Sequence, residues 1–289
     1  MAYKTKSVLV TGCSAGGIGQ AIAYAFHQKG YHVFATARTP SKIPSTLSSA
    51  PNVTVLELDV LSSDSIAEAV QSVSAKTGGR LDVLVNNAGQ ASVMPALDVD
   101  IDEAKKIFDL NFWAPLAMLQ AFAPLLIEAR GCLVNNTSAS AVCPFPLMSV
   151  YNASKAALAT ASETWRHELT PFGVRTITLI TMGVNTGSFT RPGRKPTVLP
   201  ESSRYAAIGD FVLGIQDGRM QKGAISPSEF AAKVVSEVEK GAYGTVWAGT
   251  QAFIGRLMFW LSPQPVLDML VQSIVPFAKE MAKARKKAD

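Results

Sequence analysis

The stretch SVLVTGCSAGGIG, residues 7–19, joins an apolar run to a cluster of glycines. The run predicts a buried parallel strand that starts at residue 7. After it, Gly12 can make a tight turn, Gly17 can let the backbone approach a phosphate, and Gly19 can permit close packing of helix on strand. A plain flexible turn is the alternative. A glycine cluster between the first strand and the first helix instead favours a dinucleotide pyrophosphate site at the helix N-terminus.

Short apolar runs and longer amphipathic stretches alternate along the rest of the chain. Apolar residues make up 48% of it and charged residues 17%, which suits a sizeable core. This alternation predicts a single domain over residues 1–289, a doubly wound, Rossmann-type parallel sheet of about seven strands with helices on both faces. The expected strands are 7–12, 32–37, 54–60, 81–88, 131–138, 174–181 and the weaker 245–249. The expected helices lie near 18–29, 63–77, 102–129, 151–171 and 227–240.

Two segments break the alternation. Residues 186–226 are rich in Gly, Pro, Arg and Ser and are too long for a routine connector, which predicts a substrate loop or lid. Residues 246–289 form an apolar extension with a basic end, and no uninterrupted apolar stretch in it reaches the ~18 residues typical of a membrane span. We expect an interfacial segment or a lid over an apolar pocket. A subunit interface or a core helix pair is the alternative.

The net charge of +5 is concentrated in KEMAKARKKAD (279–289) and in Arg191, Arg194 and Lys195. No helix-turn-helix, RNP or zinc-finger pattern accompanies these clusters, so no nucleic-acid partner is expected. The basic tail fits an anionic membrane surface and, equally, a solvated end. The cysteines form no CxxC motif or Cys/His cluster, so no metal site is expected, and reduced thiols indicate a cytosol-facing compartment.

The second expected strand continues into HVFATAR (32–38) and bears on the kind of dinucleotide. An NAD site usually places an acidic residue there to hold the ribose 2′-hydroxyl. Here Ala37 takes that place and Arg38 follows, and a guanidinium can bind a 2′-phosphate. NADPH/NADP+ is therefore favoured, with Ser14 as a further hydroxyl. Asp59, which ends the third strand, is placed to meet the adenine edge or to cap the next helix.

The pentapeptide YNASK places Tyr151 four residues before Lys155. On a helix these side chains lie on one face, and a nearby cation lowers the pKa of a phenol. Such a tyrosine is a usable proton donor. By itself the pair favours the simpler interpretation of a surface aromatic and a surface lysine one helical turn apart.

Together these motifs resemble the short-chain dehydrogenase/reductase family over roughly residues 7–190. The features, in chain order, are TGCSAGGIG, Asp59, NNAG (86–89), Asn111, Ser138, YNASK and TMGVNT (181–186). The resemblance implies that Tyr151 is the general acid, that Lys155 acidifies it and holds the nicotinamide ribose, and that Ser138 hydrogen-bonds the substrate carbonyl. It implies that Asn111 completes a proton relay through water. The implied cofactor-binding residues are Gly12, Ser14, Gly17, Ile18, Gly19, Arg38, Asp59, Asn87, Ala88, Gly89, Tyr151, Lys155, Val184 and Thr186.

Two departures from the family pattern are present. Four residues, Cys13 to Gly16, stand between the first glycine and Gly17, where the family usually has three. Thr181 and Met182 replace the common Pro-Gly after the sixth strand.

A closer resemblance is to the fungal branch of NADPH-dependent 1-acyldihydroxyacetone phosphate reductases. It rests on TGCSxGGIG, FATAR, the threonine at 181 and the pattern VWAG…WL-P…D within 246–271. It implies an NADPH-dependent carbonyl reductase of lipid metabolism that reduces a hydrophobic ketone, with 1-acyldihydroxyacetone phosphate as the expected substrate. Arg191, Arg194 and Lys195 are the expected phosphate partners. The C-terminal segment would contact the endoplasmic reticulum or lipid-droplet surface.

Two other functions stay open. One is a reductase or dehydrogenase of a fungal polyketide, terpenoid or steroid-like carbonyl, since kinship of fold does not specify substrate. The other is a catalytically idle NADP(H)-binding scaffold, which the full set of Asn111, Ser138, Tyr151 and Lys155 argues against. The chain could also form a homo-dimer or tetramer.

Overall fold

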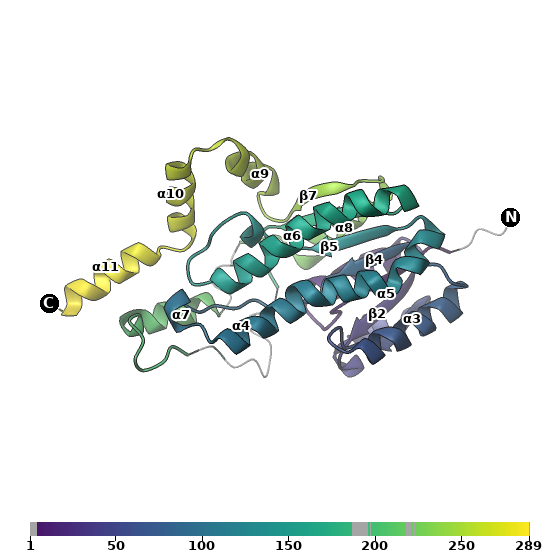
Figure 1. Ribbon diagram of the computed structural model, residues 1–289, viewed down its shortest axis with the longest axis horizontal. Helices are drawn as coiled ribbons and strands as arrows, with labels where there is room; N and C mark the ends of the chain where they lie inside the picture. Colours follow the sequence, from purple (N-terminus) through teal and green to yellow (C-terminus); the bar gives the residue numbers. More distant parts are fainter. Residues whose placement is uncertain (1–4, 187–195, 197, 218–220, 222, 289) are drawn as a thin grey trace.

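The computed structural model describes residues 5–186, 196, 198–217, 221 and 223–288. A seven-stranded sheet runs through the molecule in the order β3-β2-β1-β4-β5-β6-β7, and every neighbouring pair is parallel (Figure 1). The strands are β1 (Ser7–Val10), β2 (His32–Ala37), β3 (Val53–Glu57), β4 (Val83–Asn86), β5 (Cys132–Asn136), β6 (Arg175–Thr181) and β7 (Gly244–Ala248). The predicted doubly wound parallel sheet is confirmed, including its weakest strand.

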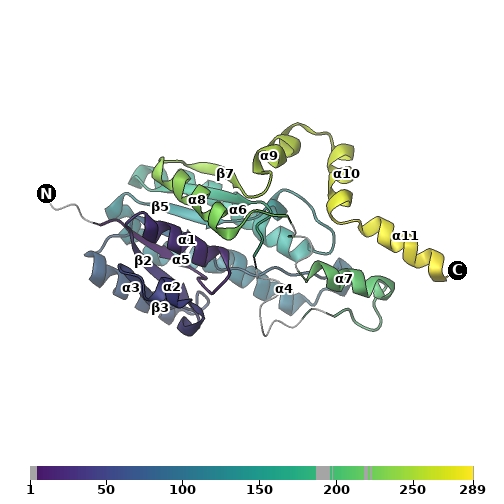
Figure 2. The same cartoon turned by 180° about the vertical axis from the view of Figure 1, so that it is seen from behind.

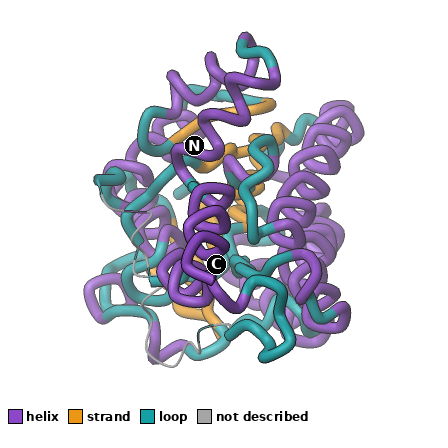
Figure 3. Tube along the Cα trace, turned by 90° about the vertical axis from the view of Figure 1, so that its left-hand side faces the viewer, coloured by secondary structure: helices purple, strands orange, loops and turns teal. Residues whose placement is uncertain are grey.

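Helices cover both faces of the sheet. One layer holds α1 (Ile18–Gln28) and α8 (Pro227–Glu239), and the other α3 (Ser63–Thr77), α5 (Ala114–Ala129) and α6 (Ser149–Leu169) (Figures 1 and 2). The strands lie between these layers when the molecule is viewed from the side of its C-terminus (Figure 3). An apolar core lies on each face of the sheet. Alternate residues of a strand belong to opposite cores, because successive side chains of a strand point to opposite faces. Val8 and Val10 pack beneath α1, and Leu9 packs beneath α5.

The helix predicted over 102–129 is one continuous helical run that changes its winding. It consists of α4 (Ile101–Phe108), a π-helical turn η3 (Asp109–Trp113) and α5. Asp100 caps its start by accepting hydrogen bonds from the backbone N–H groups of Asp102 and Glu103, and the run ends at Arg130 in the left-handed conformation. The run is long and apolar enough to cross a membrane by length and composition, but 44% of its most apolar window is buried within the protein, and α5 contributes to the sheet core.

Shorter helices connect the layers. Near the start of the chain, η1 (Pro40–Lys42) and α2 (Ser45–Ser48) follow β2. The other short turns are η2 (Ala96–Asp98), η4 (Ala139–Ala141) and η5 (Thr170–Phe172). The segment predicted as a loop over 186–226 also contains helical structure, η6 (Ala206–Ile208) and α7 (Gly209–Ile215). Its Ile208, Val212 and Ile215 are buried, and this burial stabilises the helical structure. The content of Gly and Pro alone did not predict these helices.

The C-terminal extension forms α9 (Ala252–Leu261), α10 (Gln264–Ile274) and α11 (Phe277–Ala288), which project from the sheet beyond β7 (Figures 1 and 2). The predicted boundary at 246 therefore falls inside β7. A third apolar cluster joins this extension to α7 and to two loops at the carboxyl ends of the strands. Its buried members are Val93, Leu147, Ile208, Val212, Ile215 and Val275.

Candidate active site

A cavity of about 1640 Å³ opens at the carboxyl ends of the parallel strands. It lies where the chain leaves β1 and β4 in opposite directions across the sheet, the place at which doubly wound sheets bind ligands. Of the sequence-predicted site residues, the cavity is lined by Gly12, Ser14, Gly17, Ile18, Arg38, Asp59, Asn87, Ala88, Gly89, Ser138, Tyr151, Lys155, Val184 and Thr186. Gly19 and Asn111 are not part of the lining and act from behind it.

The glycine turn has the close contacts that its composition predicted. Gly12 has a φ of +75°, and a Cβ on it would lie 3.2 Å from the Cα of Ala88. A Cβ on Gly19 would lie only 2.5 Å from the Nδ2 of Asn87 and from the carbonyl oxygen of Gly12. Any larger residue would therefore push α1 away from β4. The turn has one residue more between Gly12 and Gly17 than the family pattern. Gly16 accommodates it with a φ of +71° and donates its N–H to Gln20 Oε1 at 2.9 Å.

The start of α1 faces the cavity without a side-chain cap. Its N-cap residue, Gly17, makes no capping hydrogen bond, and both Gly17 and Ile18 line the cavity. An uncapped helix N-terminus presents free N–H groups and the positive end of the helix dipole. The turn therefore fits the pyrophosphate of a dinucleotide.

Two cations stand at the end of β2, on the rim of this part of the cavity. Arg38 and Lys42 are both exposed and both line it, and neither forms an ion pair within the described part of the chain. Sequence reasoning found Arg38 and missed Lys42, which lies in the short turn η1 after β2 and lines the same cavity. The backbone carbonyl of Lys42 also holds the glycine turn, accepting from Ala15 N–H at 2.9 Å. Two cations in this place would suit a phosphate dianion.

Asp59 follows β3 and lines the same end of the cavity. Its Oδ1 accepts from the N–H of Leu61 at 3.1 Å, and its own N–H donates to Ser65 Oγ at 3.0 Å. The N-cap of α3 is Ser62, whose side chain accepts from Ser65 N–H. The capping alternative for Asp59 is therefore wrong.

The loop after β4 is fixed by Thr11, which sequence reasoning missed. The Oγ1 of Thr11 accepts from the N–H groups of Asn87 at 2.8 Å and Ala88 at 2.9 Å. The position of this threonine directly before the glycine turn was the sequence feature that could have indicated its role. This contact sets the wall of the cavity that Ala88 and Gly89 provide.

Asn111 lies in the π-helical turn and is fully buried. Its Oδ1 accepts from the N–H of Gln90 at 2.9 Å, and its Nδ2 donates to the carbonyl of Gln90 at 2.9 Å and to Ser154 Oγ at 3.0 Å. The side chain thus holds the loop in place, and the predicted relay through water stays a prediction. A Cβ on Gly89 would lie 3.0 Å from Asn111 Oδ1 and 3.4 Å from Lys155 Nζ, so this glycine keeps open the space between the two residues.

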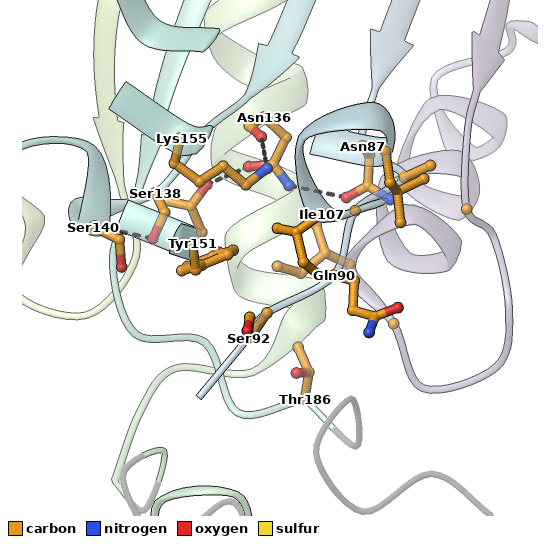
Figure 4. A pocket seen from close by; sticks show the side chains of 18 of the residues that line it. Asn87, Gln90, Ser92, Ile107, Asn136, Ser138, Ser140, Tyr151, Lys155 and Thr186 are labelled. Carbon is orange, nitrogen blue, oxygen red and sulfur yellow. Dashed lines mark hydrogen bonds between the residues drawn. The ribbon is translucent and has the colours of Figure 1, made fainter. Parts of the chain in front are cut away.

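Ser138, Tyr151 and Lys155 come together on one wall of the cavity (Figure 4). Ser138 ends the segment after β5 and accepts from Ser140 N–H at 3.1 Å, and its hydroxyl influences the pKa of Tyr151. Helix α6 begins at Ser149, ahead of the prediction, so Tyr151 and Lys155 lie in its first two turns. Lys155 is buried and donates from Nζ to the carbonyl of Asn136 at 2.9 Å.

Burial dominates the electrostatics of this wall. Burial raises the pKa of Tyr151, and the hydroxyl of Ser138 opposes that rise. Burial also lowers the pKa of Lys155, to about 8. The pKa of the phenol is raised overall because desolvation penalises its charged form. The prediction that Lys155 makes the phenol acidic stays a prediction.

Val184 and Thr186 reach the cavity although a Pro-Gly pair is missing before them. Val184 is buried and forms a parallel bridge with Ile225, and the N–H of Thr186 donates to Gln221 Oε1 at 3.2 Å. The bridge holds this strand extension in place without the proline.

The remaining lining is largely apolar and comes from distant parts of the chain. Phe145 and Met148 follow β5, Ile215 comes from α7, and Ile274 comes from α10. The C-terminal extension therefore forms part of the cavity wall, as the lid interpretation expects. The proposed phosphate partners Arg191, Arg194 and Lys195 lie outside the described residues.

Charged lining residues are unevenly distributed. Beyond the Arg38–Lys42 pair and Lys155, the described lining includes Asp98, Asp100 and Glu103. Asp98 accepts from Ser203 Oγ at 2.5 Å. Within the described residues, no three His, Cys, Asp or Glu side chains are grouped as metal ligands.

Comparison with known proteins assigns the family. The model of the short chain dehydrogenase family matches residues 6–195. The short-chain dehydrogenase ptmH of Penicillium ochrochloron is 41% identical over 266 residues, which cover 92% of this chain and 96% of that protein. The NADPH-dependent 1-acyldihydroxyacetone phosphate reductase of Schizosaccharomyces pombe is 37% identical over 283 residues, covering 93% and 94%.

Solved structures agree with this assignment at the level of the fold. A short-chain dehydrogenase from Streptomyces avermitilis has a TM-score of 0.75 and 27% identity, with 100% of both chains covered. A short chain dehydrogenase from Burkholderia cenocepacia in complex with NADP has a TM-score of 0.70 and 23% identity, with coverage of 92% and 97%. The chain therefore belongs to the short-chain dehydrogenase/reductase family of oxidoreductases.

Proposed function

We propose that this protein reduces an apolar ketone to a secondary alcohol with NADPH. The observation that carries the proposal is the grouping of Ser138 and Tyr151 beside the buried ammonium of Lys155, on the wall of a large and mainly apolar cavity. An idle scaffold has no need of these three side chains in this arrangement.

The cofactor site favours NADPH over NADH. The uncapped start of α1 is suited to the pyrophosphate, and Arg38 and Lys42 form a cationic pair at the end of β2 that is suited to a 2′-phosphate. Ala37 is buried at the position where an acidic residue would repel that phosphate. The S. pombe relative is NADPH-dependent by name, which supports the same preference.

When bound, the reduced nicotinamide supplies the hydride. The protein supplies the proton and the position. Tyr151 gives its phenolic proton to the carbonyl oxygen as the hydride reaches the carbon, so that the ketone becomes an alcohol and the tyrosine a phenolate. Ser138 donates a hydrogen bond to the same oxygen, and the ammonium of Lys155 stabilises the phenolate that remains.

Two substrate classes fit this site. 1-Acyldihydroxyacetone phosphate is the first, because a relative 37% identical carries that substrate in its name and because the cavity walls are apolar. An uncharged apolar ketone, such as a polyketide, terpenoid or steroid-like compound, is the second. It is favoured by Asp98, Asp100 and Glu103 in the lining, because carboxylates repel a phosphate.

The C-terminal extension supports contact with an anionic membrane, at the endoplasmic reticulum or a lipid droplet. Residues Phe253, Leu257, Trp260 and Leu261 form an exposed apolar stripe on α9, at the i, i+4, i+7, i+8 spacing of one helix face, and the exposed Ile254 widens it. The basic helix α11 follows, and clustered Lys and Arg side chains are attracted to anionic lipid. Co-sedimentation with vesicles containing phosphatidylserine tests this contact. If the protein self-associates and does not bind the vesicles, the stripe would instead be the interface of a homo-dimer or tetramer.

The decisive experiment follows NADPH oxidation with 1-acyldihydroxyacetone phosphate and, separately, with an uncharged long-chain methyl ketone. NADH and Tyr151→Phe run alongside as controls. Turnover with NADPH that falls at least roughly hundredfold in Tyr151→Phe, with NADPH binding retained, supports the proposal, and the better substrate decides the class. Saturable NADPH binding without turnover of any ketone favours the scaffold, and a lack of NADPH binding contradicts the proposed cofactor.

A further inference from the structure

The carboxyl ends of the central strands carry a chain of side-chain hydrogen bonds that the proposed mechanism does not use. Asn136, the last residue of β5, is 8% exposed and uses both ends of its carboxamide. Its Oδ1 accepts from Thr181 Oγ1 at 2.5 Å, and its Nδ2 donates to Asn87 Oδ1 at 2.9 Å. The side chain is therefore fixed between the ends of β6 and β4.

The chain continues to β1. The Nδ2 of Asn87 donates to the carbonyl of Thr11 at 2.7 Å. Four adjacent strands are thus tied together at their carboxyl ends, directly beneath the cavity that Asn87, Asn136 and Thr181 line. A polar network in which each amide group has a partner holds its members rigidly.

The same residue holds Lys155 through its backbone. The carbonyl oxygen of Asn136 accepts from Lys155 Nζ at 2.9 Å, as Figure 4 shows. Lys155 is only 5% exposed, and a buried ammonium is stable only where its donors find acceptors. A rotation of the peptide at Asn136 would move or discharge the lysine.

We propose that Asn136 and Thr181 together are positioning residues for Lys155. Their side-chain hydrogen bond, with Asn87 as the second anchor, fixes the peptide carbonyl that holds the ammonium beside Tyr151. The hydroxyl at 181 makes this bond available, because the proline that the family commonly has there could not donate to Asn136. The proposal rests on the proposed reductase function.

The test compares Thr181→Val, which removes the donor and keeps the β-branched shape, with Thr181→Ser, which restores the donor. Thr178→Val is the matched control. It removes a buried hydroxyl from the same strand, one that donates to Ser162 Oγ at 2.7 Å and has no link to Lys155. We expect Thr181→Val to lower kcat roughly tenfold, Thr181→Ser to recover most of it, and Thr178→Val to lose stability without this loss of kcat.

A second readout does not depend on turnover. NADPH affinity is measured by fluorescence from neutral to alkaline pH, and it falls where Lys155 loses its charge. We expect this fall to move to lower pH in Thr181→Val and in Asn136→Ala, and the double variant to lose no more than the single ones. An unshifted pH dependence, additive losses, or an equal effect of Thr178→Val would overturn the proposal. If Thr181→Val does not fold, the same criteria apply to Asn136→Ala. Absent turnover with an intact pH shift would contradict only the reductase function.

Discussion

The carboxyl ends of the strands and the C-terminal extension meet at the same cavity but are stabilised in opposite ways. At the strand ends and in the π-helical turn behind them, buried polar side chains such as Asn136 and Asn111 are paired with partners from distant strands and loops. On α9, Trp260 is 86% and Phe253 78% exposed, although both are large and apolar. The comparison teaches that polar side chains are paired where catalysis needs rigidity, while apolar ones lie open where a further surface can bind.

The inner face of α9 makes this contrast clearer. Gly255 is buried, and a Cβ on it would lie 2.7 Å from the Cε of Met182. Phe259 stacks on Trp247 of β7 with ring centroids 6.1 Å apart. The helix is therefore firmly docked on one side and apolar on the other, an arrangement expected where a lipid surface or another chain covers the outer side.

Replacement of Lys155 by methionine should have the largest effect. It should reduce turnover by roughly a hundredfold or more, because the ammonium stabilises the phenolate of Tyr151. It should also stabilise the fold at pH 7, by about 2 kcal/mol net, because a charge with a folded pKa of about 8 is no longer buried. Urea unfolding of both proteins measures this.

The pH dependence of that stability has a defined sign. The pKa of Lys155 is lowered from 10.5 to about 8 on folding, so the unfolded chain binds more protons between these values. The cost is fully present below about pH 8, and the wild type should gain on the variant as pH rises towards 10.5. A stability difference that stays constant over this window would contradict the burial of the ammonium.

Replacement of Arg38 by alanine should have the next largest effect. It should raise the KM for NADPH by roughly ten- to a hundredfold and leave the KM for NADH nearly unchanged, because a charge-assisted contact to the 2′-phosphate is lost. Lys42→Ala should act in the same direction and more weakly, since an ammonium is less suited to bidentate binding. An equal rise in KM for NADPH and NADH would show that Arg38 does not contact the 2′-phosphate. Lys29→Ala, at the far end of α1, is a suitable control.

Gly89→Ala tests how closely the strand-end loop is packed. The added methyl would lie 3.0 Å from Asn111 Oδ1 and 3.4 Å from Lys155 Nζ. Because both side chains are buried and hydrogen-bonded, we expect kcat to fall roughly tenfold. Gly30→Ala is less suited as a control because its φ is +79°, so Gly209→Ala, with nothing within 4 Å, is preferred. An unchanged kcat in Gly89→Ala would show that this wall of the cavity can accommodate a methyl group without moving Asn111 or Lys155.

Trp260→Ser should have the smallest effect on the protein in solution. We expect the free energy of unfolding to change by less than about 0.5 kcal/mol, because the ring is almost fully exposed. Turnover of a soluble ketone should be unchanged, while binding to vesicles that contain anionic lipid should weaken. Loss of solution activity in this variant would tie α9 to the cavity and remove the contrast between the two regions.

Much of the fold could be predicted because its signals are local. Strand β2 was predicted with its observed bounds, and α3 likewise, since continuous apolar runs and 3.6-residue periodicity are written within short segments. The helices α7, α9, α10 and α11 were not predicted as separate helices. Their apolar residues pack on one another and on remote loops, as Val275 and Val93 do, and a periodic pattern does not reveal such partners.

The site divides in the same way. Motif order predicted that Ser138, Tyr151 and Lys155 act together, but it did not reveal that burial raises the pKa of the tyrosine, because burial depends on what the whole fold places around the phenol. Lys42 was missed because it reaches the cavity only through the turn after β2.

By itself the sequence determined the order of strands and helices, the glycine turn, the cation at the end of β2 and the residues proposed to carry the proton. These depend on spacings of a few residues, which local geometry converts directly into faces and turns. Only the tertiary structure decided the contacts that hold Lys155. Thr181 and Asn136 are 45 residues apart, and Asn136 and Asn87 are 49 apart. They meet because parallel strands bring their carboxyl ends to one edge of the sheet, and no short-range pattern in the chain records that meeting.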